Sequence, residues 1–294
     1  MNLHHKWEQT GDLFQERYNS FKEADAQIVS SIKRRAVVVD CEMVGISHGL
    51  SELARLCAVD YLSGEVLLDV FVDPGNNVCD YRSRYSGITA ARLQKAKDSG
   101  NCLSSWKEAR EALLYFIDNK TILIGAALHN DLEVLRLVHR NVVDSSIVSQ
   151  QKVGHPWNRN WGLKQLAKDM INLDVQSSES GHDPLEDCLA TREIVLWMTY
   201  ISGPRFEQWA VVKRKQEEER FVEEKHRRES HRQKQLEEKQ AGIDAACVKA
   251  GLPTSYEQFL AEEYGYHEEN RAKSEGDEPT FQVPKTTRHD NNDW

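Results

Sequence analysis

Two acidic residues two positions apart, Asp40 and Glu42, have a type and spacing that suit chemistry. They follow the apolar run Ala36-Val37-Val38-Val39, which is typical of a buried strand. Side chains two positions apart in a strand point to the same side, so both carboxylates would lie on one face. Buried carboxylates repel each other unless a cation lies between them, so the pair predicts a cation site. The alternative is a strand that ends in solvent, where the two acids are harmless.

A third acid, Asp131, stands in Leu128-His129-Asn130-Asp131, between an apolar stretch at residues 121–126 and a predicted helix. Its position suits a side chain that joins the pair at the end of a neighbouring strand. The alternative is a cap or first-turn acid, because the helix dipole favours negative charge there.

A histidine and a fourth acid, His182 and Asp187, flank the start of a later predicted helix in which Pro184 suits the first turn. A short loop and one helical turn can bring an imidazole and a carboxylate to the same pocket. The alternative for His182 is a surface or capping role. We expect Asp183 to cap the helix and Glu186 to face solvent.

The elements that must position these side chains form an α/β pattern. Three runs with short connections, at residues 36–39, 53–61 and 66–72, predict an antiparallel meander. Helices and strands then alternate, which indicates a mixed sheet flanked by helices. The predicted elements are a helix at 105–118, a strand at 121–126, a helix at 129–138, a strand end at 142–144, and helices at 162–170 and 184–200.

Composition narrows the class of protein. The 294 residues contain no run of 18 apolar residues, and the N-terminus has no signal-peptide pattern, so we expect an intracellular protein without a membrane span. The six cysteines include no C-x-x-C pair, which argues against a zinc protein or a disulfide framework. The net charge of −9 argues against a broad basic nucleic-acid-binding face. Bound divalent cations would nevertheless let an acidic site accept phosphate.

The two ends of the chain differ from its centre. Residues 1–34 are predicted to be a helical lead-in that packs on the core through Trp7, Leu13, Phe14, Tyr18 and Phe21. Residues 35–204 form the predicted catalytic domain. Residues 205–270 are predicted to be a charged helical extension, because 213–240 carry ten Lys and Arg against eight Asp and Glu with few apolar residues. Residues 271–294 have the composition of a disordered tail.

The order Asp-x-Glu, Asp, then His-x-x-x-x-Asp resembles that of the DEDDh exonucleases. Within that superfamily, Asp40-Cys41-Glu42-Met43-Val44-Gly45 resembles the eukaryotic RNA exonuclease (Rex) branch, which includes ribosomal-RNA-processing exonucleases and the interferon-stimulated exonuclease. The resemblance covers residues 35–202. Other matching segments are Asp80-Tyr81-Arg82, Ser86-Gly87-Ile88-Thr89, Ala127 to Asp131, Asp144-Ser145 and Leu185-Glu186-Asp187.

The resemblance implies an RNase H-like fold, a mixed five-stranded sheet flanked by helices, and a 3′→5′ exonuclease that releases nucleoside 5′-monophosphates. It implies two Mg²⁺ or Mn²⁺ ions held by four acids, with a histidine that takes the proton from the attacking water. In this sequence the ligands would be Asp40, Glu42, Asp131 and Asp187, and the base His182. Contacts to the terminal nucleotide would come from Met43, Arg82, Leu128 and Asn130.

The resemblance also implies the partners: single-stranded RNA 3′ ends, in RNA or ribosomal-RNA processing, with a nuclear or nucleolar location. Departures from the pattern are Gly125-Ala126, Asp73 and Pro184-Leu185; the lost positive charge at position 73 bears on substrate preference. Two alternatives are a nuclease of this fold that acts mainly on single-stranded DNA and a non-catalytic RNA-binding scaffold. Residues 213–266 are a candidate surface for a protein partner.

Overall fold

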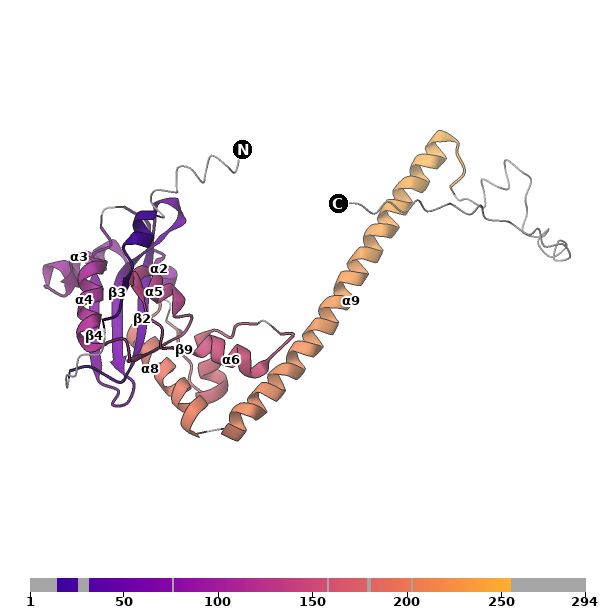
Figure 1. Cartoon of the computed structure of the whole chain (residues 1–294). Coiled ribbons are helices and arrows are strands. Elements are labelled where there is room, and N and C mark those ends of the chain that lie inside the picture. The colour runs from indigo at the N-terminus through magenta and orange to yellow at the C-terminus, as the bar shows by residue number, and fades with distance from the viewer. Residues whose placement is uncertain are drawn as a thin grey trace, which may run out of the picture. The chain divides into compact units, whose positions relative to one another are not determined.

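The computed structural model describes residues 15–25, 32–75, 77–157, 159–178, 181–201 and 203–254. Its centre is a sheet in the order β6-β4-β3-β2-β7-β9, with β5 also paired to β2 (Figure 1). The meander β2-β3-β4 is antiparallel, as predicted, and β7 and β9 add to it in parallel. The short β5 and β6 extend the predicted five strands to seven. The strands are β2 Ala36–Ile46, β3 Ser51–Asp60, β4 Val66–Val72, β5 Val78–Asp80, β6 Cys102–Leu103, β7 Ile122–Gly125 and β9 Val142–Asp144.

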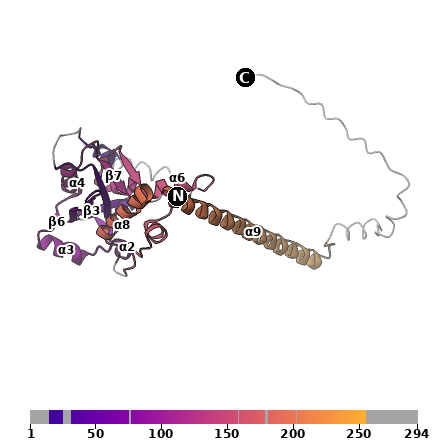
Figure 2. The same cartoon turned by 90° about the horizontal axis from the view of Figure 1, so that it is seen from below.

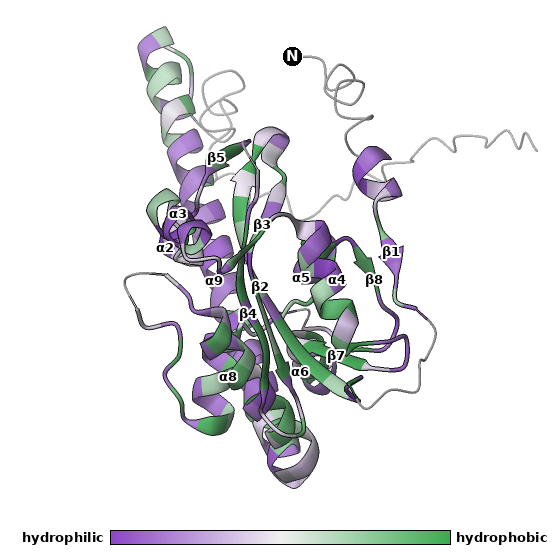
Figure 3. Cartoon of the chain, turned by 90° about the vertical axis from the view of Figure 1, so that its left-hand side faces the viewer, coloured by the Kyte–Doolittle hydropathy of each residue, from purple (hydrophilic) through white to green (hydrophobic). Residues whose placement is uncertain are grey.

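Helices cover both faces of this sheet, which confirms the predicted fold class. Helices α4 (Trp106–Phe116) and α5 (His129–Leu135) pack on one face, where Val37 and Val39 of β2 meet Leu113. Helix α8 (Pro184–Leu196) packs on the other face against Val38. Figure 2 shows β3 between α4 and α8, and Figure 3 shows apolar residues concentrated on the inner sides of these layers. The alternation of side chains along β2 therefore serves two cores at once.

Three helices were not predicted: α2 (Ser83–Ser86), α3 (Ala90–Asp98) and α6 (Ser145–Val153). Serines and β-branched residues dominate the start of α6, so its intrinsic helix propensity is low. The predicted helix at 162–170 is present as α7 (Leu163–Leu166) and a π-helical turn at Ala167–Ile171. A second π-helical turn, Trp197–Ile201, follows α8.

The predicted helix 129–138 is too long. Helix α5 ends at Leu135 because Arg136 adopts a left-handed conformation with φ 49°. The next two residues form β8 (Leu137–Val138), which pairs in parallel with β1 (Lys22–Glu23). The N-terminal segment is thus attached to the domain by a strand pair.

Only part of the predicted N-terminal helix lies within the described residues, at 15–19. Its contact residue is Arg17, which is 8% exposed, whereas Tyr18 is 74% exposed and does not pack. Trp7, Leu13 and Phe14 lie outside the described residues.

Helix α9 (Gly203–Ala250) contains the predicted charged helix. Its first turns belong to the compact unit that ends at Glu218: Phe206, Trp209 and Ala210 join a buried cluster with Trp161 and Leu166. The unit from Glu219 onward is solvated along the helix, with i,i+4 ion pairs such as Arg228–Glu224 at 2.6 Å. Helix α9 continues to Ala250 within the predicted extension 205–270. The rest of that extension after residue 254 and the predicted disordered tail at 271–294 lie outside the described ranges.

Two expectations from composition have structural counterparts. Among the described residues, no helix combines the length and the apolar character needed to cross a membrane. All six cysteines are free thiols, of which Cys41, Cys57 and Cys188 are buried and Cys79 is exposed.

Candidate active site

Strand β2 places Asp40 and Glu42 on the face of the sheet covered by α8, because they alternate with Val39 and Cys41, which face α4 and α5. Glu42 is only 7% exposed, so the harmless solvent-facing alternative does not apply to it. Asp40 keeps partial exposure. The open side of the acidic cluster therefore lies over Asp40.

Asp131 lies in the first turn of α5 and is 4% exposed. It does not cap its helix; its Oδ1 accepts a hydrogen bond of 2.8 Å from the backbone N–H of Cys41. This bond holds Asp131 against β2 at Cys41, the residue between Asp40 and Glu42 in the sequence.

Asp144, at the end of β9, holds the loop that leads into α5. Its carboxylate accepts hydrogen bonds from the backbone N–H groups of Leu128 at 2.8 Å and Ala127 at 3.2 Å. Ala127 adopts a left-handed conformation with φ 57°, which these bonds stabilise. Asp144 is thus a positioning residue for Asp131.

His182 and Asp187 lie at the start of α8, as predicted. Asp183 caps the helix by accepting from the N–H of Leu185, and Pro184 occupies the first turn. Asp187 is 4% exposed, and its Oδ2 is 3.8 Å from Nδ1 of His182, whose side chain is 34% exposed. The histidine therefore meets both the acid cluster and solvent. Glu186 is exposed, as expected, and accepts a bond from the Gln176 N–H.

Burial raises the pKa of all four carboxyl groups, and the charges of the other acids add to the shifts of Asp40 and Glu42. Burial, followed by the charges of Asp131, Asp187 and Glu42, raises the pKa of Asp40 well above its usual range. Burial and then Asp187 raise the pKa of Glu42 to about 9, although Arg55 opposes this shift. Burial also raises the pKa of Asp131 to about 8 and that of Asp187 above its usual value. Without a cation, protons are the species that neutralise this cluster.

One positive charge beside the cluster, Arg55 of β3, was not singled out from the sequence. It stands opposite Glu42 in the β2–β3 register. Its guanidinium bonds both oxygens of Asp69, at 2.9 and 3.1 Å, and reaches Asp183 at 3.3 Å. Arg55 thereby ties the N-terminus of α8 to the sheet. An arginine inside an otherwise apolar strand was the available signal.

The donor set fits hard divalent cations, because it consists of carboxylate oxygens. Asp187 Oδ1 is buried without a hydrogen-bond partner among the described residues, which leaves an acceptor for a cation. The other oxygen, Oδ2, accepts a hydrogen bond of 2.7 Å from Nε2 of Gln176. Within the described residues, no three His, Cys, Asp or Glu side chains already stand at the spacing of a complete metal site. Cation binding would therefore require these side chains to move closer together, and Asp187 Oδ1 could serve as a ligand while Oδ2 keeps its bond to Gln176.

The four expected nucleotide contacts are placed unequally. Met43 is partly exposed at a register shift in β2, and Asn130 is exposed at the start of α5. Arg82 lies near the end of β2, where its guanidinium is beside Gly45. Its Nη1 donates a hydrogen bond of 2.8 Å to Ser51 Oγ. Leu128 is 2% exposed and packs on Gly125, where an added Cβ would meet it at 2.7 Å. The structure thus buries Leu128 beneath the site.

A mixed sheet whose central strand and two helix starts gather four carboxyl groups and a histidine defines a nuclease of the RNase H-like class. Residues 37–195 match the RNase T family model described as Exonuclease, and the chain belongs to this exonuclease family. RNA exonuclease 3 of Candida albicans is 35% identical over 178 residues, covering 60% of this chain and 41% of that protein. The human interferon-stimulated 20 kDa exonuclease-like 2 is 36% identical over 169 residues, covering 55% of this chain and 45% of that protein.

These relatives confirm the resemblance to the eukaryotic RNA exonuclease branch. The chain spans less than half of the length of each. Among solved structures, the Neurospora crassa Pan2 catalytic unit superposes with a TM-score of 0.53 at 23% identity, over 66% of this chain and 32% of that one. A Saccharomyces cerevisiae Pan2 module in complex with AAGGAA RNA gives a TM-score of 0.54 at 18% identity, over 66% of this chain and 34% of that one. These likenesses show the fold.

Proposed function

We propose that this protein is a 3′→5′ exoribonuclease that releases nucleoside 5′-monophosphates from single-stranded RNA. The observation that carries the proposal is the junction of Asp40, Glu42, Asp131 and Asp187, with Nδ1 of His182 3.8 Å from Asp187 Oδ2. The choice of RNA as the substrate is supported by the names of the relatives and by the RNA bound to the similarly folded Pan2 module.

Each side chain has a proposed task. The four carboxylates would hold two Mg²⁺ or Mn²⁺ ions, which would lower the pKa of a water and offset negative charge at the phosphate. His182 would accept the proton of the attacking water at Nε2, because Nδ1 faces Asp187. Arg55 and Asp144 would act as positioning residues. Met43, Asn130 and Arg82 would contact the substrate, and Leu128 would support the loop from below.

The test is digestion of a 5′-labelled single-stranded RNA and of the matching DNA with Mg²⁺ or Mn²⁺. We expect a ladder that shortens from the 3′ end of the RNA, is abolished by EDTA and is lost in Asp40→Ala. His182→Ala should lower kcat by about 10²–10⁴-fold, the usual contribution of a general base. Intact RNA and DNA under both metals would contradict the proposal. Preferential digestion of the DNA would show that the substrate is single-stranded DNA rather than RNA.

A second prediction concerns the loop that carries His182. Gly181 has φ 95°, and a Cβ there would lie 2.2 Å from the backbone nitrogen of Gly87. Gly181→Ala should displace the loop and break the 2.6 Å bond from the His182 N–H to the Tyr85 carbonyl. We expect kcat to fall by about tenfold to a hundredfold, because the base loses its position. Gly100→Ala is the matched control, since Gly100 also has positive φ, 73°, but nothing within 4 Å. Equal kcat in the two variants would show that loop position does not matter.

The biological setting is part of the proposal. Membership of the RNA exonuclease branch supports a role in RNA processing or turnover, with ribosomal RNA as the first substrate to test and the nucleus or nucleolus as the location. Residues 213–266 are proposed to offer a surface for a protein partner. Imaging the tagged full chain and sequencing RNA 3′ ends after its depletion would test the setting.

A further inference from the structure

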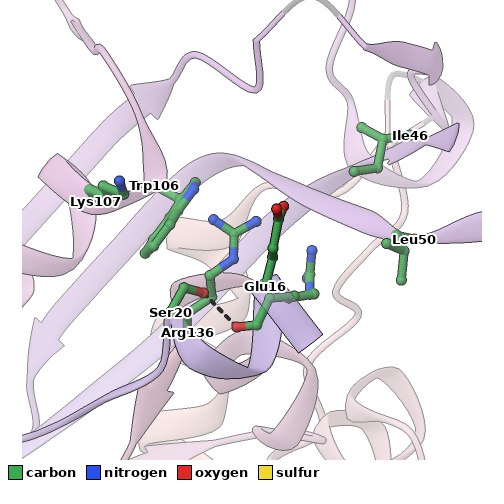
Figure 4. A pocket seen from close by; sticks show the side chains of 8 residues that line it. Glu16, Ser20, Ile46, Leu50, Trp106, Lys107 and Arg136 are labelled. Carbon is green, nitrogen blue, oxygen red and sulfur yellow. Dashed lines mark hydrogen bonds between the residues drawn. The ribbon is translucent and has the colours of Figure 1, made fainter. Parts of the chain in front are cut away.

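A second pocket lies apart from the acid cluster, between the N-terminal segment and α4. Its volume is about 270 Å³. Figure 4 shows Trp106, Lys107 and Arg136 on one side of it and Ile46 and Leu50 on the other. Glu16, Arg17 and Ser20 of the N-terminal segment complete its lining.

The buried charges around this pocket do not balance. Arg17, Arg110 and Arg136 are 8%, 9% and 8% exposed, whereas Glu52 is the carboxylate buried among them, at 7%. Glu52 Oε2 forms ion pairs with two of the arginines, at 2.8 Å from Arg136 Nη2 and 3.9 Å from Arg17 Nη1. The other facing acids, Glu133 and Glu111, are 53% and 56% exposed and add little in solvent. A buried excess of positive charge calls for an anion.

The guanidinium groups are fixed in place, and some of their N–H groups lack a hydrogen-bond partner. The Nε atoms of Arg17, Arg110 and Arg136 have no hydrogen-bond partner among the described residues, and among the oxygens the same holds for Glu52 Oε1. The Arg136 guanidinium stacks 3.8 Å from the centre of the Trp106 ring, and that of Arg110 lies 5.0 Å from it. The exposed Lys107 adds a further positive charge at the rim, opposed there by the exposed Glu16. Stacking fixes the planes of the guanidiniums, which suits them to phosphate oxygens.

The lowered pKa of Arg136 also reflects the repulsion among these groups. Burial lowers the pKa of Arg136, Glu52 opposes this effect, and the neighbouring Arg17 and Arg110 lower the pKa further. A bound anion would relieve these costs.

Helix α5 and Ser51 connect the pocket to the acid cluster and to a proposed substrate contact. Helix α5 starts beside Asp131 and ends at Leu135, so Arg136 is five residues, roughly 8 Å of helix, from Asp131. Ser51 links the pocket to the proposed substrate contact Arg82, since its carbonyl accepts from Arg17 at 3.0 Å and its hydroxyl from Arg82 at 2.8 Å.

We infer that this pocket binds a backbone phosphate of the RNA, a few nucleotides upstream of its 3′ end. The inference rests on the proposed function and deepens it, because it predicts a preference for substrates long enough to reach from the acid cluster to Arg136. Sequence would matter little at this contact, since a phosphate carries no base information.

The test compares a decamer RNA with a dinucleotide, using the full chain and kcat/KM for each. Lys107→Glu is the main variant: the residue is exposed, and an acid in the first turn of α4 suits the helix dipole. The ratio of decamer to dinucleotide kcat/KM should fall about threefold to tenfold, and the salt dependence of decamer binding should become shallower. Glu16→Gln should shift the ratio in the opposite direction. Lys95→Glu, an equal charge change on exposed α3, is the control.

Arg136→Gln should lower the ratio further, with its unfolding temperature measured in parallel because it loses the ion pair to Glu52. An unchanged ratio in Lys107→Glu and Arg136→Gln would overturn the inference, as would an equal loss for both substrates. If the wild type cleaves neither RNA, the proposed function fails. Binding of a labelled decamer RNA in EDTA, measured by anisotropy, then tests separately whether the pocket binds a phosphate. Weaker binding by Lys107→Glu than by Lys95→Glu would support it, and equal binding would overturn it.

Discussion

Replacing Glu42 with glutamine should remove nuclease activity and, in the same protein, raise the temperature at which the metal-free form unfolds. The activity should fall by about 10³-fold or more, because an amide cannot replace a charged metal ligand. The stability should rise because burial, followed by the charge of Asp187, raises the pKa of the 7% exposed Glu42 to about 9. The neutral amide folds without the free-energy cost of protonating this carboxylate at neutral pH. A gain of about 1–3 kcal/mol corresponds to about 3–10 °C for a domain of this size.

The matched control is Glu186→Gln, the same chemical change on an exposed acid one residue before Asp187. It should keep its activity, and its unfolding temperature should change by no more than about 1–2 °C. Thermal unfolding in EDTA and steady-state hydrolysis of RNA measure the two effects. A Glu42→Gln protein that is inactive but also less stable would show that Glu42 supports the fold rather than a cation.

The metal-free protein should lose stability as pH rises from about 4.5 to about 9. The pKa values of Glu42 and Asp131 are about 9 and about 8 in the folded protein, against ordinary values of 4.5 and 3.8. Between these limits the folded state binds more protons than the unfolded state, so the free energy of unfolding falls with pH. Their stabilising effect is complete below the ordinary values and lost above the raised ones. The total change should be on the order of 10 kcal/mol.

Divalent cations should reverse this trend, because they hold the carboxylates ionised and compete with protons. Unfolding temperatures at pH 5, 7 and 9 should therefore diverge between EDTA and Mn²⁺, with the largest difference at pH 9. Glu42→Gln serves as the reference, since it should show a shallower decline in EDTA. Parallel curves for the wild type and this variant would argue against a cation site at Glu42.

Local rules predicted the parts of the site that depend on one element. The period of a strand was enough to place Asp40 and Glu42 on one face, and the Asp183-Pro184 signal was enough to start α8 where Asp187 could turn inward. The three apolar runs and their short connections likewise predicted the antiparallel meander.

The parts that depend on contacts between distant segments could not be predicted in this way. Arg55 reaches Asp69 and Asp183 across three elements, and Asp144 holds the backbone of Leu128 from another strand. The loss of Leu128 from the surface follows from the absence of a Cβ at Gly125, which lets the leucine sink into the core. The end of α5 at Leu135 follows from the left-handed Arg136, whose carbonyl accepts from both Lys22 and Arg110.

The first turns of α9 also decide where the nuclease module ends. The family match stops at residue 195, but Trp209 donates to Asp169 at 3.0 Å and Lys213 pairs with the same carboxylate at 2.9 Å. Phe206 and Trp209 close an apolar cluster that also contains Ile194 of α8, the helix that carries Asp187. A fragment cut at the homology boundary would uncover that cluster beneath its own catalytic helix. The early residues of the charged extension therefore cannot be exchanged as an independent module, because they form part of the compact unit that ends at Glu218.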